Sequence, residues 1–133
     1  MIVGSKDEIK RIYISGPITN VKNWKKNFLL AEKKILELDK TFAVVNPLRI
    51  SERIEKDFAK YEKTPDYQDY MREDIKLLAD CNAICMLPGW KRSKGARLEY
   101  RIAKILNLAI IELWSVNRNY ELCKNIACCT EKK

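Results

Sequence analysis

Residues 83 to 99, AICMLPGWKRSKGARLE, contain the three elements that decide the fold. The apolar run at residues 83–87 is typical of a buried strand. Gly89 and Gly95 allow the following loop to turn and to approach a ligand closely. Ser93 is placed to cap a helix after this loop. Four apolar residues then recur with helical spacing, Ala96, Ile102, Ala103 and Leu106. The stretch therefore predicts a strand, a loop and a helix in succession.

Charged side chains give this stretch its chemical character. Lys91, Arg92 and Lys94 make the loop strongly basic. Glu99 falls in the first or second turn of the predicted helix, on the same face as its apolar residues. A carboxylate in that position is a candidate for catalysis. The alternative, equally open at this point, is a capped surface helix whose glutamate offsets the helix dipole.

Strands and helices alternate on both sides of this stretch. Strands are predicted at residues 11–15, 42–45, 83–87 and 108–113, and helices at residues 24–38, 67–79 and about 96–106. Gly16-Pro17 ends the first strand, and Asn107 closes the last of these helices. Residues 51–63 are charged with few apolar anchors, which is typical of a short helix or a mobile excursion.

The two ends of the chain show weaker patterns. Residues 1–10 are polar and predict a loose lead-in. Residues 115–133 form a tail of uncertain structure. Within it we expect a loop at residues 115–119, a short helix at 120–129 and disorder at 130–133.

The predicted strands are almost continuously apolar, which is typical of a parallel sheet covered on both faces. With right-handed crossovers, a chain of this length predicts an α/β, flavodoxin-like doubly wound sheet of four or five strands, with helices on both faces. We expect residues 1–133 to form a single domain. In this fold class ligands bind at the carboxyl ends of the strands, here between the loops 15–20 and 87–95.

Asp74 is a second carboxylate at a position where the pattern predicts an apolar residue. It lies four residues from both Tyr70 and Leu78 in the predicted helix 67–79. The helix could bring it to the same pocket as Glu99. The alternative is a surface acid paired with Arg72 or Lys76.

Composition limits the chemistry that is available. The chain of 133 residues has no His, which excludes Ser-His and Cys-His nucleophile pairs. No pair of its five cysteines has zinc-finger spacing, so no metal site is expected. The odd number of cysteines and the lack of a secretory signal predict reduced thiols and a cytoplasmic location. No apolar run is long enough to span a membrane.

Net charge indicates the kind of partner. The chain carries 26 Lys and Arg against 18 Asp and Glu, a formal net charge of +8. This favours an anionic partner, either a phosphorylated small molecule or nucleic acid. The basic residues are scattered, and the clustered basic and aromatic surface of single-strand binders is missing, so nucleic acid is the weaker alternative.

Five motifs occur in order over about residues 11 to 113, namely YISGPIT (13–19), NP (46–47), YMRED (70–74), LPGW (87–90) and SKGA (93–96) with Glu99. In this pattern the chain resembles a small bacterial and phage family of unknown function, DUF4406-like. That family is similar to the nucleoside 2-deoxyribosyltransferases and the deoxynucleoside 5'-monophosphate N-glycosidases. The block from LPGW to Glu99 is the specific part of the match.

The resemblance implies roles for individual residues. Glu99 matches the catalytic nucleophile and Asp74 the acid that assists it. Ser93 matches the position at which the monophosphate glycosidases carry a phosphate-binding Ser and the transferases carry Asp. The substrate-binding residues are expected to be Tyr13, Ser15, Gly16, Pro17, Trp90, Ser93, Lys94 and Gly95. Asn82 departs from the Asp that relatives usually have, and the tail after Leu113 does not match well.

This resemblance implies cleavage of the N-glycosidic bond of a nucleotide or nucleoside, by hydrolysis or base exchange. Such cleavage passes through an oxocarbenium-like state, which a carboxylate facing C1' can stabilise. No cofactor or metal is expected. In the superfamily a neighbouring subunit contributes a residue to the site, so the resemblance implies a homodimer or larger oligomer. The alternative function is a nucleotide-binding or sensing domain that keeps the pocket without turnover.

Overall fold

A computed structural model describes residues 10–116 and 119–122 of the chain. Its elements are β1 (Arg11–Ser15), α1 (Trp24–Leu38), β2 (Ala43–Val45), α2 (Pro47–Ala59), α3 (Tyr67–Ala79), β3 (Ala83–Met86), the 3-10 helix η2 (Trp90–Arg92), α4 (Lys94–Ile105), β4 (Ala109–Val116) and β5 (Asn119–Leu122). The four predicted strands and the three predicted helices are confirmed, with ends that differ by up to three residues.

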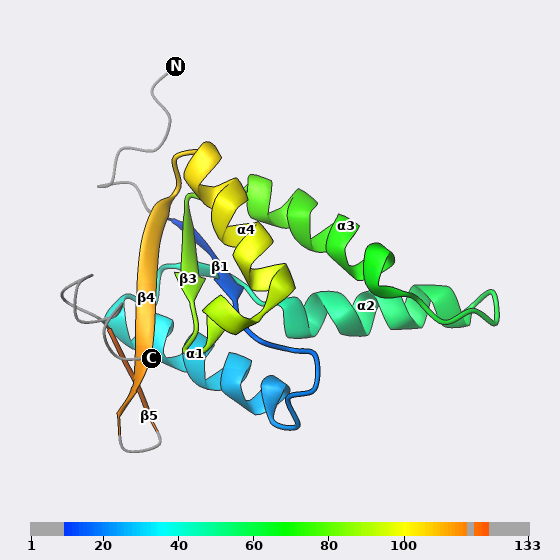
Figure 1. Cartoon of the computed structure of the whole chain (residues 1–133), viewed down its shortest axis with the longest axis horizontal. Helices are drawn as coiled ribbons and strands as arrows, with labels where there is room; N and C mark the ends of the chain where they lie inside the picture. The colour runs from blue at the N-terminus through cyan, green and yellow to red at the C-terminus, as the bar shows by residue number, and fades with distance from the viewer. Residues whose placement is uncertain (1–9, 117–118, 123–133) are drawn as a thin grey trace.

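The five strands form one sheet in the order β2-β1-β3-β4-β5. The first four strands run parallel, and β5 pairs antiparallel to β4. The strand β4 is long and curved, and β5 folds back along its end (Figure 1). The architecture is therefore a mixed α/β fold with a mostly parallel sheet that curls into a half-barrel, rather than the regular doubly wound sheet expected from the sequence.

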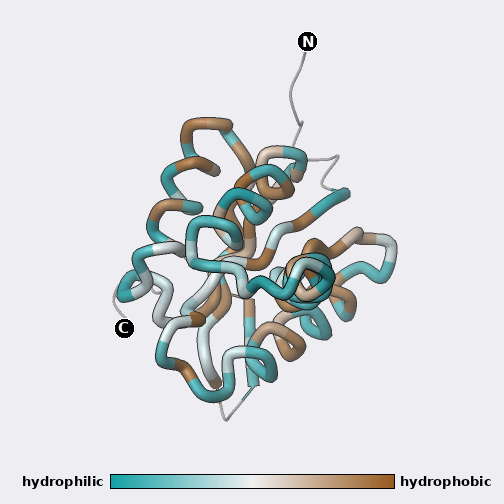
Figure 2. The backbone as a smooth tube through the Cα atoms, turned by 90° about the vertical axis from the view of Figure 1, so that its right-hand side faces the viewer, coloured by the Kyte–Doolittle hydropathy of each residue, from teal (hydrophilic) through white to brown (hydrophobic). Residues whose placement is uncertain are grey.

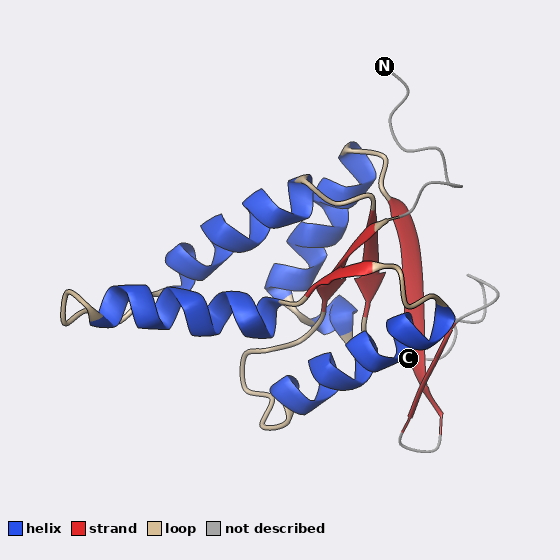
Figure 3. Ribbon diagram, turned by 180° about the vertical axis from the view of Figure 1, so that it is seen from behind, coloured by secondary structure: helices blue, strands red, loops and turns tan. Residues whose placement is uncertain are grey.

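Each face of the sheet has its own apolar core. Side chains alternate along β1, so Ile12 and Ile14 pack with Phe28 of α1, whereas Tyr13 packs with Leu78 of α3 on the opposite face. Helices α2, α3 and α4 share this second face, and α1 lies on the first (Figures 1 and 3). Hydrophobic and hydrophilic residues alternate along the helices (Figure 2), as expected for helices with one buried face.

Helix α2 corrects the prediction for residues 51–63. The helix begins earlier, at Pro47, because the Asn46 side chain accepts a hydrogen bond from the Leu48 amide at 3.0 Å and Pro suits the first helical position. Its apolar anchors include Leu48 and Ile50, which precede the window that appears poor in apolar residues. The helix alternative is therefore confirmed for residues 51–59, which belong to an ordinary amphipathic helix, whereas residues 60–62 form a turn.

The tail prediction is wrong where the structure describes it. Residues 115, 116 and 119 lie in strands, not in a loop, and residues 120–122 belong to β5, not to a helix. Tyr120 on β5 is buried among apolar residues of β1, β3 and α1, which explains why this segment pairs with the sheet. The expected lead-in at residues 1–9 and the remainder of the final helix and terminus at 123–133 lie outside the described residues.

Two simpler findings complete the fold. Cys81 and Cys85 are buried free thiols, whereas the other three cysteines lie outside the described residues. None of the helices between residues 10 and 122 that the structure describes has the length and apolarity needed to cross a membrane.

Candidate active site

Glu99 is held by two hydroxyl groups from the central strand. The Tyr13 hydroxyl donates to Glu99 Oε2 and the Ser15 hydroxyl donates to Glu99 Oε1, each at 2.6 Å. Residues 13 and 15 share one face of β1 because side chains alternate along a strand, and that face is covered by α4. Only 5% of Glu99 is exposed to solvent. The interpretation of Glu99 as a surface residue is therefore wrong, although Ser93 does cap the helix as expected.

Burial sets the charge of Glu99. Burial raises the pKa of this carboxyl to about 7, and the hydrogen bonds from Ser15 and Tyr13 oppose the rise by stabilising the ionised form. The pKa of Tyr13 is raised well above its ordinary value, first by burial and then by the neighbouring Glu99, so its hydroxyl stays protonated as a donor. The ionised and protonated forms of Glu99 are thus balanced near neutral pH.

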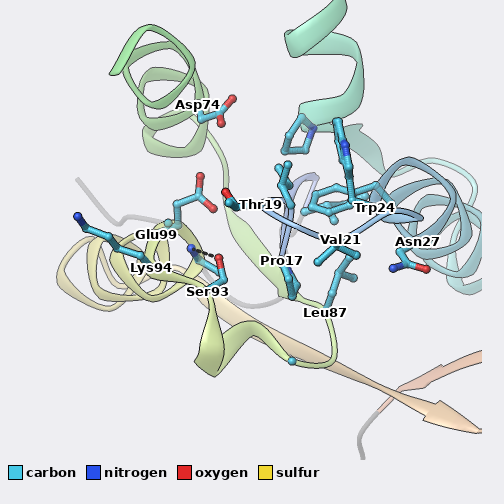
Figure 4. Close-up of a pocket in the computed structure, with 18 of the residues that line it drawn as sticks. Pro17, Thr19, Val21, Trp24, Asn27, Asp74, Leu87, Ser93, Lys94 and Glu99 are labelled. Atoms are coloured by element: carbon cyan, nitrogen blue, oxygen red, sulfur yellow. Dashed lines mark hydrogen bonds between the residues drawn. The ribbon is translucent and has the colours of Figure 1, made fainter. Parts of the chain in front are cut away.

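Asp74 lies on α3, which packs beside α4. It is 8% exposed and makes no hydrogen bond or ion pair with any residue in the described part of the chain. Burial raises its pKa to about 8, and repulsion by Glu99 and then Glu73 adds to the rise. The alternative of a surface acid paired with Arg72 or Lys76 is wrong, because Asp74 is buried and Lys76 pairs with Glu73 instead. Asp74 and Glu99 both point toward one space (Figure 4).

That space is a cavity of about 1110 Å³ at the carboxyl ends of β1, β2 and β3. Eight of the predicted site residues line it, namely Tyr13, Gly16, Pro17, Asp74, Ser93, Lys94, Gly95 and Glu99. Ser15 is not in the lining and acts through its hydrogen bond to Glu99. The loops after β1 and β3 therefore meet the helices α3 and α4 around a single cavity.

Trp90 does not line the cavity, contrary to the expectation from the sequence. It lies in η2, where its ring stacks on Tyr100 with centroids 4.5 Å apart. The short helix turns the ring toward α4 and away from the loop after β1. Trp90 thus supports the position of α4 and does not face the cavity.

The amino end of α4 forms a cationic wall of the cavity. Ser93 Oγ accepts a hydrogen bond from the Ala96 amide at 3.2 Å, as seen in Figure 4. Arg92 and Lys94 line the cavity beside it. Positive charge and the helix dipole coincide here, which makes this wall suited to an anionic group.

Gly16 allows the loops after β1 and β3 to touch. A Cβ atom at residue 16 would lie 2.7 Å from Leu87 Cβ, which is too close for any side chain there. Gly89 on the second loop has a φ of +84°, a conformation that other residues rarely adopt. These two glycines shape the cavity floor.

Asn82 has a structural role. Its Oδ1 accepts hydrogen bonds from the amides of Lys10 and Arg11, at 3.2 and 3.0 Å. The side chain therefore ties the start of β1 to the start of β3, far from the two carboxyls along the strands. The departure from the family pattern at this position leaves the cavity unchanged.

Several residues in the cavity wall were not predicted as site residues from the sequence. Tyr67, Tyr70 and Met71 of α3 line it, together with Glu55 of α2. Repulsion from Glu99 and Asp74 adds to burial in raising the pKa of Tyr67, so its hydroxyl lies within electrostatic reach of both. The sequence pattern assigns these α3 residues to an apolar stripe. Only the phenol groups of Tyr67 and Tyr70 could have indicated a polar role.

The raised pKa of Asp74 predicts a stability change with pH. In the unfolded chain this carboxyl ionises near the ordinary pKa of an aspartic acid, 3.8, but in the folded protein its pKa is about 8 and it keeps its proton up to about that pH. The contribution of this carboxyl to the free energy of unfolding is complete below its pKa in the unfolded chain. It is lost as pH rises through its pKa in the folded protein. We expect Asp74→Asn to unfold at a similar urea concentration to wild type near pH 4. Above pH 8 it should be more stable by a few kcal/mol. If the stability difference between Asp74→Asn and wild type were the same at all pH values in this range, the raised pKa of Asp74 would be contradicted.

A solved structure of a conserved protein from Enterococcus faecalis V583 is similar to the chain, with a TM-score of 0.62 and 21% sequence identity. The similarity covers 83% of this chain and 66% of that protein, so the chain spans slightly less than two thirds of its length. At this identity the match supports the fold. No curated protein matches the sequence significantly.

A family model covers most of the described chain. It matches residues 10–112, a span that includes β1, the loops around the cavity and both buried carboxyls. The chain therefore belongs to the DUF4406 family, a domain of unknown function.

Proposed function

We propose that this domain cleaves the N-glycosidic bond of a (deoxy)nucleoside 5'-monophosphate or nucleoside, by hydrolysis or base exchange. The observation that carries the proposal is the pair of buried carboxyls, Glu99 and Asp74, which face one cavity and have pKa values raised to about 7 and 8. Two acids with different proton affinities beside a substrate-sized space suit a reaction that needs one base and one acid. The four parallel strands, in the order β2-β1-β3-β4, also follow the order of flavodoxin-like folds, which bind ligands at the carboxyl ends of their strands, although β5 is antiparallel here.

Glu99 serves as the nucleophile in this proposal. The ionised carboxylate attacks C1' of the sugar as the bond to the base breaks, and forms a sugar ester that water or a second base then opens. The hydroxyls of Tyr13 and Ser15 fix both carboxylate oxygens, so little reorganisation is needed during the reaction. The pKa of about 7 leaves Glu99 partly ionised at neutral pH.

Asp74 serves as the acid. When the C1'–N bond breaks, its electrons move to the base nitrogen, and the proton held by Asp74 neutralises that nitrogen. A carboxyl with a pKa of about 8 is still protonated when Glu99 is largely ionised. Water or the incoming base gives a proton back to Asp74 when the ester opens. Both carboxyls are then in their starting protonation states, and the reaction needs no cofactor.

Incubation with nucleotides tests this function directly. The purified protein is mixed with a panel of nucleosides and their 5'-monophosphates, and free base is measured by chromatography. Release of base, with or without exchange for a second base, is the expected result. Binding without release would favour the alternative function, a nucleotide-binding or sensing domain.

A preference for 5'-monophosphates is expected from the amino end of α4. Ser93 is neutral and lies beside Arg92 and Lys94, whereas an aspartate there would repel a phosphate. We expect wild type to act faster on monophosphates than on nucleosides, and Ser93→Asp to reverse or abolish that preference. Asp can also cap a helix, so α4 should remain formed. Equal turnover of both substrate types by wild type would refute this expectation.

We further propose that the protein acts as a homodimer or larger assembly, as the resemblance to the deoxyribosyltransferases implies. The structural basis for a shared site would lie in the tail, most of which is outside the described residues. Sedimentation equilibrium measures the assembly, and a monomer at all concentrations would exclude this arrangement.

A further inference from the structure

Glu55 and Tyr70 form a polar pair in the cavity wall, apart from the two buried carboxyls. The Tyr70 hydroxyl donates to Glu55 Oε2 at 2.8 Å, from α3 to α2. Both residues line the same cavity as Glu99 and Asp74. The pair plays no part in the cleavage step proposed above.

The position of this pair follows from the geometry of α3. Tyr70 precedes Asp74 by four residues, so the two side chains lie on one face, about 6 Å apart along the helix axis. That distance is comparable to the width of a nucleobase. If the base leaves from Asp74, its far edge can extend along α3 toward Tyr70 and Glu55.

The pair presents hydrogen-bond acceptors to the cavity. Burial, and then the hydrogen bond to Glu55, raises the pKa of Tyr70 to about 12, so the phenol stays protonated with its hydrogen committed to Glu55. Glu55 forms no salt bridge with any residue of the described ranges 10–116 and 119–122. A carboxylate only accepts hydrogen bonds, and the second oxygen of Glu55 has no hydrogen-bond partner among the described residues.

We infer that Glu55, oriented by Tyr70, selects nucleotides whose base carries an amino group on its outer edge. This inference rests on the proposed function and specifies its substrate class. An exocyclic amino group donates to a carboxylate, whereas a carbonyl oxygen at the same place faces negative charge without a hydrogen atom between them. Cytosine and adenine are therefore favoured over uracil and hypoxanthine, which carry a carbonyl oxygen in place of the amino group.

Binding to matched pairs of nucleotides tests the inference without depending on turnover. The Glu99→Gln protein is titrated calorimetrically with the 5'-monophosphates of deoxycytidine and deoxyuridine, and of deoxyadenosine and deoxyinosine. We expect the amino-bearing member of each pair to bind about tenfold more tightly or better. Adding Glu55→Gln should reduce each ratio toward one, because an amide both donates and accepts. Tyr70→Phe should weaken the preference without reversing it.

Glu52→Gln is the matched control, since Glu52 is exposed on the same helix and does not line the cavity. It should leave both ratios unchanged. Base release by wild type with no preference within the pairs would overturn the inference while the proposed function stands. A preference that survives Glu55→Gln would also overturn it. Selective binding without base release would support the inference and contradict the cleavage step, and failure of every nucleotide to bind would overturn both.

Discussion

Replacement of Glu99 by glutamine is expected to lower the rate of base release by roughly three orders of magnitude or more, while nucleotide binding persists. Glutamine keeps the size of the side chain, and its amide can accept a hydrogen bond from one of the two hydroxyls of Tyr13 and Ser15 and donate one to the other. It lacks the negative charge that would stabilise a cationic sugar, and it cannot form the ester. The lost interaction exists mainly in the transition state, so kcat should fall far more than binding weakens.

Two measurements make this result decisive. Single-turnover assays give the rate of base release, and calorimetry gives the dissociation constant for the same nucleotide. Glu52→Gln, on the exposed side of α2, should retain full activity and shows that loss of a carboxylate elsewhere is harmless. A Glu99→Gln protein that releases base at the wild-type rate would refute the mechanism. Circular dichroism shows that the variant is folded.

Asp74→Asn is expected to reduce kcat/KM by about 10²–10⁴-fold and to change the shape of the pH profile. Wild type needs Glu99 ionised and Asp74 protonated, so kcat/KM should rise through about pH 7 and fall through about pH 8. The asparagine cannot give up a proton, and the falling limb should disappear. The rising limb, which belongs to Glu99, should remain.

Glu73→Gln provides the comparison for this profile. Glu73 neighbours Asp74 and contributes to its raised pKa by repulsion, but its side chain pairs with Arg53 and Lys76. Its neutralisation should preserve activity and move the falling limb slightly toward lower pH. A falling limb that persists in Asp74→Asn would show that another group controls it.

Periodicity explains why the two carboxyls could be identified from the sequence. In both α3 and α4 a regular apolar stripe is interrupted by one acid, and the strand-loop-helix order brings those helices to the same face of the sheet. The hydroxyl partners of Glu99 follow from the alternation of β1, which places residues 13 and 15 on one side. Local patterns of this kind constrain which face of an element is buried.

Local patterns could not predict contacts that depend on three-dimensional packing. Trp90 was expected in the cavity, but its orientation depends on the stacking with Tyr100, which no spacing rule reveals. The pairing of Glu55 with Tyr70 joins two helices whose packing angle the sequence does not specify. The strand β5 was missed because Tyr120 favours a strand through burial against other elements, and its own segment is too short to show a period.

The lengths of the outermost strands limit how copies of this protein can associate. In the described residues the sheet ends with the three-residue strand β2 on one side and the four-residue strand β5 on the other. Exposed edge strands are the places where a sheet can recruit a strand from another molecule, and short edges offer few unpaired backbone groups for this. An oligomer of this domain is therefore expected to assemble through contacts between side chains on its helices and loops, and not by continuation of the sheet from one copy to the next.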